Sequence, residues 1–92
     1  MKNKKLIPIR KKLDKIDTKL LFLFKERTLL VNNVLKTKRF KNEIIDKKRI
    51  KIILKIIRKK SVKLKIDTIL TKRIWTSIIR AYIDYEFRNF KK

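Results

Sequence analysis

Several charged residues that could bind a ligand or take part in catalysis lie at positions where the apolar pattern predicts a core residue. Arg27 lies seven residues after Leu20 and seven before Val34, on a helical seam that would normally carry Leu or Ile. A guanidinium cannot lose its charge there, so it either reaches water or meets an anion. The complete inward-facing polar set is Arg10, Arg27, Lys38, Asp46, Arg49 and Glu86. Such a set predicts a cationic pocket for a small dianion, with two carboxylates for hydroxyl contacts or ion pairs.

The spacing of the cations along the first helix predicts how that pocket is assembled. Lys38 follows Arg27 by roughly 16 Å along the helix axis, and Arg10 precedes it by roughly 25 Å. A small metabolite cannot contact both Arg10 and Lys38 of one straight helix. Two such helices packed antiparallel would offer Arg27 and Lys38 from one chain and Arg10 from the other. We therefore expect a homodimer with shared sites.

A long helix from Pro8 to about Lys41 must position three of these cations. Pro8 suits the first helical turn, where its missing N–H would have no partner in any case. Residues 1–7 are basic and are expected to be frayed. The apolar seam of the helix, with alternating spacings of three and four, consists of Leu13, Ile16, Leu20, Leu23, Leu30 and Val34.

Two shorter helices are predicted to follow. Asp46 is placed to cap a helix from about Lys47 to Lys60, with Arg49 on its inward stripe. The expected apolar members of that stripe are Ile45, Ile53 and Ile56. After a loop over 61–66, Asp67 is placed to cap a third helix that continues to about Asn89. The inward stripe of the third helix is Leu70, Ile74, Trp75, Ile78, Ile79, Tyr82, Glu86 and Phe90.

The residue types that the sequence lacks exclude several kinds of catalytic and binding site. The 92 residues make one small domain, 1–92, and the absence of Cys and His removes thiol nucleophiles and the usual general base. The absence of Gly excludes phosphate-binding glycine loops. No apolar run is long enough to span a membrane, and no apolar signal core follows the basic N-terminus. These features predict a cytoplasmic protein without metal or other cofactor.

The net charge of +22 favours an anionic partner, nucleic acid or membrane first. Against that, Lys and Ile dominate the whole chain and Ala is almost absent, which is typical of a compositional bias that loads solvated faces with Lys. A basic helical nucleic-acid-binding protein is accordingly the alternative function, in which Arg27 merely reaches water. A helix-bundle interaction protein without a ligand is the third hypothesis.

Several segments of the chain resemble one enzyme family in order and spacing. The segments 9–23, 25–27 and 30–38 resemble the first helix of the all-helical, AroQ-class chorismate mutases. Segment 45–49 is similar to the start of that family's second helix, and segment 73–81 to its third. The resemblance covers about residues 6–88. It implies an intertwined all-α homodimer with three helices per chain.

The resemblance also implies a reaction. Chorismate carries two carboxylates and rearranges to prephenate, in the shikimate pathway to phenylalanine and tyrosine, by an intramolecular pericyclic shift. This isomerisation needs no nucleophile and no proton relay. It needs the substrate held in a reactive conformation, and positive charge at the ether oxygen of the breaking bond. A site without His, Cys, metal or cofactor is therefore sufficient.

The resemblance assigns roles to the cations. Arg10 of the partner chain and Arg27 would bind the two substrate carboxylates. Lys38 would reach the ether oxygen, and Arg49 would support the carboxylate end. Asp46 would face the ring hydroxyl, although it is also placed to cap a helix.

The remaining positions include departures from the family pattern. Glu86 stands where many relatives carry a Gln that donates to the ether oxygen, and a Glu must be protonated to donate. With Lys38 and Arg27, it completes the expected catalytic set. Tyr82 replaces a small Ser near one carboxylate. Ile50 replaces a Glu that contacts the substrate hydroxyl, which implies a slow enzyme, a repositioned acid such as Asp46, or a degenerate member.

Overall fold

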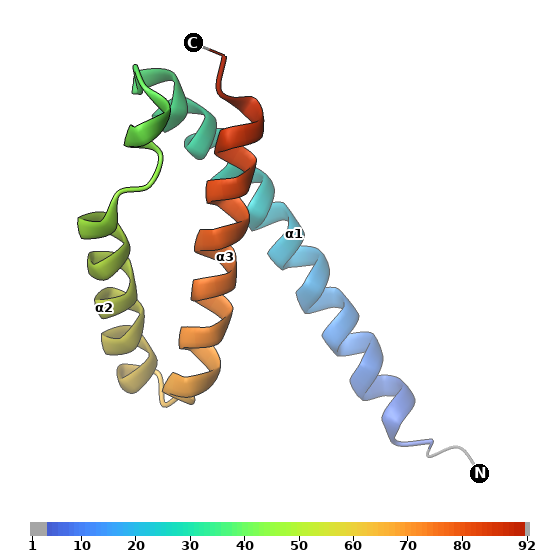
Figure 1. The fold of residues 1–92 in the computed structure, drawn as a ribbon. Coiled ribbons are helices and arrows are strands. Elements are labelled where there is room, and N and C mark those ends of the chain that lie inside the picture. Colours follow the sequence, from blue (N-terminus) through green and yellow to red (C-terminus); the bar gives the residue numbers. More distant parts are fainter. Residues whose placement is uncertain (1–3, 92) are drawn as a thin grey trace. The chain divides into compact units, whose positions relative to one another are not determined.

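The protein is all-helical over residues 4–91, the part of the chain that the computed structural model describes. Its elements in order are α1 (Leu6–Thr37), a short 3₁₀ helix η1 (Lys41–Glu43), α2 (Lys47–Lys63) and α3 (Thr68–Asn89) (Figure 1). No strand occurs among these residues. The prediction of an all-α chain with three main helices is confirmed.

Helix α1 differs from its expected bounds at both ends. It begins at Leu6, so residues 6 and 7, expected to be frayed, are helical, while residues 1–3 lie outside the described part. Pro8 still falls in the first turn, whose N–H groups need no helical partner. The helix ends at Thr37, not near Lys41. The chain then turns through η1, which brings it to the start of α2.

The chain divides into two compact units, and the boundary falls within α1 between Asn33 and Val34. The first unit consists of helix α1 up to that boundary. Its predicted apolar seam is exposed in the single chain. Five seam residues have at least 45% of their surface accessible, namely Leu13, Ile16, Leu20, Leu23 and Leu30.

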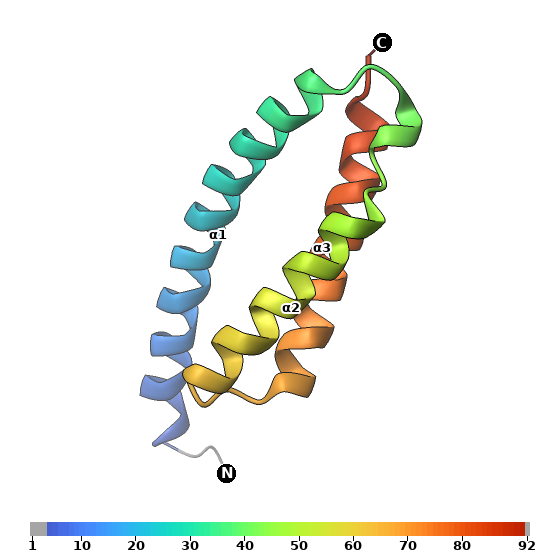
Figure 2. The ribbon, with the colours of Figure 1, turned by 90° about the vertical axis from the view of Figure 1, so that its left-hand side faces the viewer.

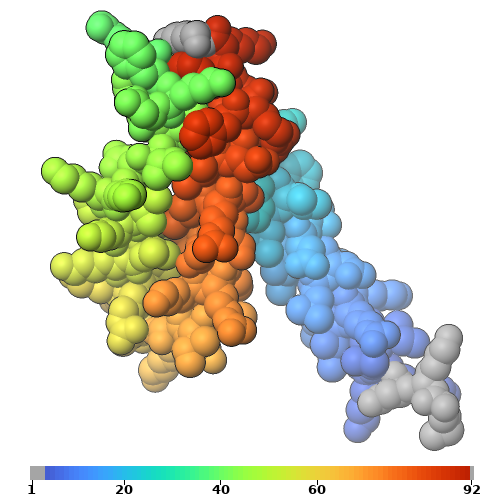
Figure 3. All heavy atoms as spheres, in the orientation of Figure 1, coloured from blue at the N-terminus to red at the C-terminus, as the bar shows by residue number. Residues whose placement is uncertain are grey.

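The second unit is built on a hairpin of α2 and α3, which run side by side in opposite directions (Figures 1 and 2). Asp67 caps α3, as expected, and its Oδ1 accepts from the N–H of Ile69 at 2.8 Å. Long side chains project outward from α2 (Figure 3). Among the residues of 4–91, no helix is long and apolar enough to cross a membrane.

The predicted loop over 61–66 is wrong in its first half, because α2 continues to Lys63. Two backbone hydrogen bonds close the helix end: the N–H of Ile66 donates to Ser61 and the N–H of Lys65 donates to Val62. This is the Schellman arrangement, whose turning residue adopts a left-handed conformation that favours Gly. Lys65 occupies it with φ 58°. Because the chain has no Gly, no residue type in the sequence marks this helix end.

The interior of the second unit is small and differs from the predicted stripes. Ile44 is 3% exposed and Ile45 is 46% exposed, so the expectation for Ile45 was off by one residue. The reason is that Ile44 closes the 3₁₀ turn, whereas Ile45 precedes the α2 cap. Ile56 is also exposed. Ile53 is half-buried, as predicted, and the other half-buried apolar residues of α2 are Ile50, Leu54 and Ile57.

A buried pair of hydroxyls joins α2 to α3. Ser61 Oγ lies 2.8 Å from Thr71 Oγ1, and both residues are buried. Thr71 thus takes an inward position on α3, whereas the predicted stripe members Leu70 and Ile74 are exposed. The hydroxyl of Ser61 has one hydrogen and lies 2.6 Å from the carbonyl of Ile57. Thr71 Oγ1 likewise lies 3.4 Å from the carbonyl of Thr68, so either hydroxyl can be the donor to the other.

Candidate functional site

Two of the predicted site residues meet at the end of α3. Lys38, one residue past α1, donates from Nζ to Glu86 Oε1 at 3.0 Å, and 48 positions separate them in sequence. Their side chains are 15% and 10% exposed. This ion pair is thus largely withdrawn from water, where electrostatic interactions are stronger than at the surface.

The helices on either side determine where this pair forms. Glu86 lies seven residues after Ile79 and four after Tyr82, so it belongs to the buried face of α3. Lys38 donates its backbone N–H to Leu35, a buried residue of the last turns of α1. Because Lys38 follows the helix directly, its position is defined by that last turn.

An open cavity of ≈ 560 Å³ lies beside the pair. Lys38 and Asp46 both line it, so the structure brings together two residues that the sequence placed in the site. Thr37, Glu43, Ile45, Lys47 and Lys48 complete the lining. Sequence reasoning missed Glu43, because the 3₁₀ turn η1 that places it carries no periodic signal, and it missed Thr37, the last residue of α1. The mixed charges make this a polar cavity of a size that suits a small metabolite.

Asp46 caps α2, as predicted. Its Oδ1 accepts from the backbone N–H of Arg49 at 3.0 Å. The cap accounts for one carboxylate oxygen. Contact between Asp46 and a substrate hydroxyl stays a prediction.

Arg49 was predicted to face inward, and this prediction is wrong for the single chain. Its side chain is exposed, and Ile50, the next residue, takes the inward position. The reason is the register of α2: the half-buried positions Ile50, Ile53 and Ile57 recur at spacings of three and four, and Arg49 lies off that face. A role for Arg49 in substrate binding stays a prediction.

The other predicted residues occupy separate places. Arg10 is exposed and Arg27 half-buried, and both lie on the part of α1 that belongs to the first unit. Tyr82 is half-buried on α3, and its ring meets the ring of Tyr85 edge-on at 6.2 Å between centroids. Among residues 4–91, no cluster of three or more His, Cys, Asp or Glu could hold a metal ion.

The described residues thus form an all-helical protein in which a largely buried lysine–carboxylate pair lies beside a polar cavity. The family model for chorismate mutase type II matches residues 9–87, most of the chain. The chain belongs to this family, the all-helical AroQ class, and is an isomerase that acts on chorismate. Comparison with curated proteins found no match, and comparison with solved structures found none either. Neither the family match nor the described residues favour the nucleic-acid-binding alternative.

Proposed function

We propose that the conversion of chorismate to prephenate takes place in the cavity beside Lys38 and Glu86. The observation that carries this proposal is the 3.0 Å contact between Lys38 Nζ and Glu86 Oε1. It joins Lys38, which lines a polar cavity, to a carboxyl 48 positions further along the chain. The family match runs through both residues.

In this proposal Lys38 stabilises the charge that develops on the ether oxygen. An ammonium group has three hydrogens, and Glu86 accepts one of them. Two remain for the substrate. Glu86 then acts as an acceptor that holds Lys38, in contrast to the expectation that it donates to the ether oxygen itself. Positive charge fixed before the reaction lowers the barrier without reorganisation at the moment of bond breaking.

Substrate carboxylates require further cations, for which Arg27, Arg49 and a partner's Arg10 are our candidates. Asp46 is the candidate for the ring hydroxyl. Ile50, where the family pattern has Glu, provides no polar contact, so we expect weak recognition of that hydroxyl. Tyr82, one turn before Glu86 on α3, is the candidate lining residue at one carboxylate.

We further propose that two chains form the active dimer by pairing their α1 helices. The exposed seam of α1 supports this, because an apolar seam repeated at spacings of three and four suits a second helix of the same kind.

We place the reaction in the cytoplasm, and the absence of Cys fits a reducing compartment.

The experiment that tests the proposed site follows the loss of chorismate absorbance with purified protein and identifies prephenate as the product. Lys38→Ala should lower kcat by about 10²–10³-fold with a smaller effect on KM, because its charge serves the transition state. Lys41→Ala removes an exposed lysine that lines no part of the cavity, and it should retain the parent rate. Equal rates for Lys38→Ala and the parent would place the chemistry elsewhere.

A further inference from the structure

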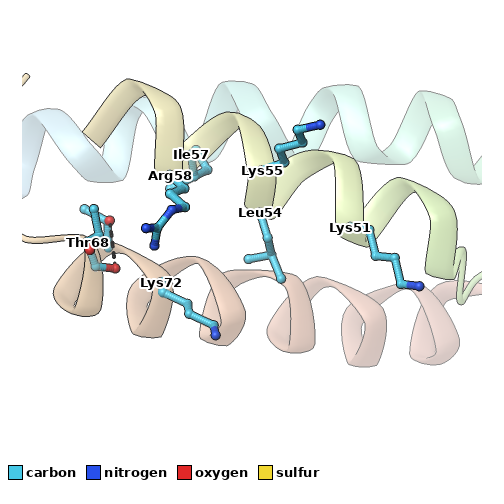
Figure 4. A pocket seen from close by; sticks show the side chains of 8 residues that line it. Lys51, Leu54, Lys55, Ile57, Arg58, Thr68 and Lys72 are labelled. Atoms are coloured by element: carbon cyan, nitrogen blue, oxygen red, sulfur yellow. Dashed lines mark hydrogen bonds between the residues drawn. The ribbon is translucent and has the colours of Figure 1, made fainter. Parts of the chain in front are cut away.

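A second cavity of ≈ 360 Å³ lies on the α2–α3 hairpin, and its lining shares no residue with the cavity beside Lys38 (Figure 4). Leu54 and Ile57 of α2 form its apolar part. Leu54 points toward α3 in the close view (Figure 4). A concave apolar surface of this kind suits the carbon skeleton of a small ligand.

The charged lining of this cavity is entirely cationic. Lys51, Lys55 and Arg58 come from α2, and Lys72 comes from α3. Within residues 4–91, no carboxylate forms an ion pair with any of the four. Arg58 reaches from α2 toward α3, where Lys72 lies, whereas Lys55 points away from α3 (Figure 4). Cations on both walls of one cavity favour an anion between them.

The two walls are held together before any ligand binds. Thr71 lines the cavity and its hydroxyl forms a hydrogen bond with that of Ser61 across the hairpin at 2.8 Å, and both residues are buried. A preformed site binds more tightly because less conformational freedom is lost on binding.

The N-terminus of α3, which lies near this cavity, does not itself supply the anion site. Asp67 already accepts from the N–H groups of Ile69 and Leu70, at 2.8 and 3.4 Å. Its carboxylate also occupies the helix terminus with negative charge. The attraction for an anion must therefore come from the lining cations, of which Arg58 and Lys72 stand on opposite walls.

We propose that this cavity binds a small organic phosphate. The guanidinium of Arg58 presents paired N–H groups that match phosphate oxygens, and Lys72 supplies a second positive charge from the opposite helix. The carbon part of the ligand lies against Leu54 and Ile57. The site is separate from the proposed chorismate site and does not depend on it.

Phenyl phosphate is the probe for this site, titrated by calorimetry, with inorganic phosphate as the comparison. The apolar lining predicts that phenyl phosphate binds about tenfold or more tightly than inorganic phosphate. The double variant Arg58→Gln and Lys72→Gln should lose at least about tenfold in affinity. Trp75, the single tryptophan, lies one turn after Thr71 and gives an independent fluorescence signal.

A matched control separates this site from the general positive charge. Lys59→Gln and Lys63→Gln together remove the same charge from exposed α2 positions that do not line the cavity, and they should leave binding unchanged. Equal losses in both double variants would overturn the proposal, since attraction would then follow net charge alone. Loss of binding in Lys38→Ala but not in the Arg58 and Lys72 variant would also overturn it. Chorismate turnover, measured in the Arg58 and Lys72 double variant and in the Lys59 and Lys63 double variant, should stay at the parent rate and reports on the catalytic proposal separately.

Discussion

Glu86 accepts a hydrogen bond from Lys38 at 3.0 Å through Oε1, so Lys38 occupies one oxygen of the carboxyl that the family pattern suggests as a donor to the substrate. The two side chains are mostly buried, and each is the other's ion-pair partner. Breaking a buried pair by removing one member typically leaves a charge without compensation. The pair therefore couples the placement of Lys38 to the identity of residue 86.

Replacing Glu86 tests whether it holds Lys38. In Glu86→Gln the amide oxygen still accepts from Lys38, and the amide nitrogen adds a donor for the ether oxygen. One such hydrogen bond is worth about 1 kcal/mol, so kcat/KM should rise about fivefold. Glu86→Ala should lower kcat/KM about tenfold or more and reduce the free energy of unfolding by about 3 kcal/mol. Steady-state kinetics and urea unfolding measure both. Identical kinetics for the Gln and Ala variants would exclude this role.

The position of Ile50 predicts a gain of recognition. Ile50→Glu should restore a charge-assisted contact to the substrate hydroxyl, worth about 1–3 kcal/mol, which corresponds to roughly 5- to 150-fold in kcat/KM. Because Ile50 is half-buried, the variant should also be less stable than the parent. Ile50→Gln is the uncharged control and should gain less. A folded Ile50→Glu protein with parent turnover would show that this position does not face the substrate.

Shared sites in a dimer predict complementation between two inactive variants. Arg10→Ala and Arg27→Ala should each be nearly inactive. In a mixed dimer one site carries both lesions and the other carries neither, so random exchange should restore about a quarter of the sites. Activity after exchange, with mixed dimers verified by mass, is the measurement. Proven exchange without recovered activity would contradict shared sites.

The left-handed conformation of Lys65 predicts a stabilising substitution. A residue with a Cβ destabilises the folded state by about 1–2 kcal/mol in this conformation. Gly removes this strain, but it also makes the unfolded chain more flexible, which offsets part of the stabilisation. Lys65→Gly should therefore raise the free energy of unfolding by about 0.5–1 kcal/mol. Lys63→Gly, within the last turn of α2, should lower it by about 1 kcal/mol. Urea unfolding compares them, and a loss of stability in both would be inconsistent with the observed helix end.

The buried hydroxyls of Ser61 and Thr71 predict coupled losses of stability. Ser61→Ala and Thr71→Val should each cost about 1–2 kcal/mol, because each leaves a buried partner without its hydrogen bond. The double variant should cost less than their sum by about 1 kcal/mol. Thr71→Ser keeps the hydroxyl and is the control. Strictly additive losses would mean that the two hydroxyls do not interact.

The sequence by itself determined the elements of this protein and the class of its chemistry. Helical periodicity and the caps at Asp46 and Asp67 depend on residues within one or two turns of each other, so they can be recognised without a fold. The positions of Arg10, Arg27 and Lys38 along α1 can likewise be read from the sequence alone, and these three cations predicted a dianionic ligand.

Only the tertiary structure decided which side chains meet. The contact between Lys38 and Glu86 joins positions 48 residues apart, and it depends on how α3 packs beside the end of α1. The outward position of Arg49 follows from the rotation of α2 against α3, where a change of one residue turns a side chain by about 100°. The apolar pattern predicts the buried face of a helix only approximately. It therefore cannot decide which of the neighbouring residues Arg49 and Ile50 faces the interior. The second cavity likewise has no sequence signature, because its walls come from two helices that the pairing of Ser61 with Thr71 brings into register.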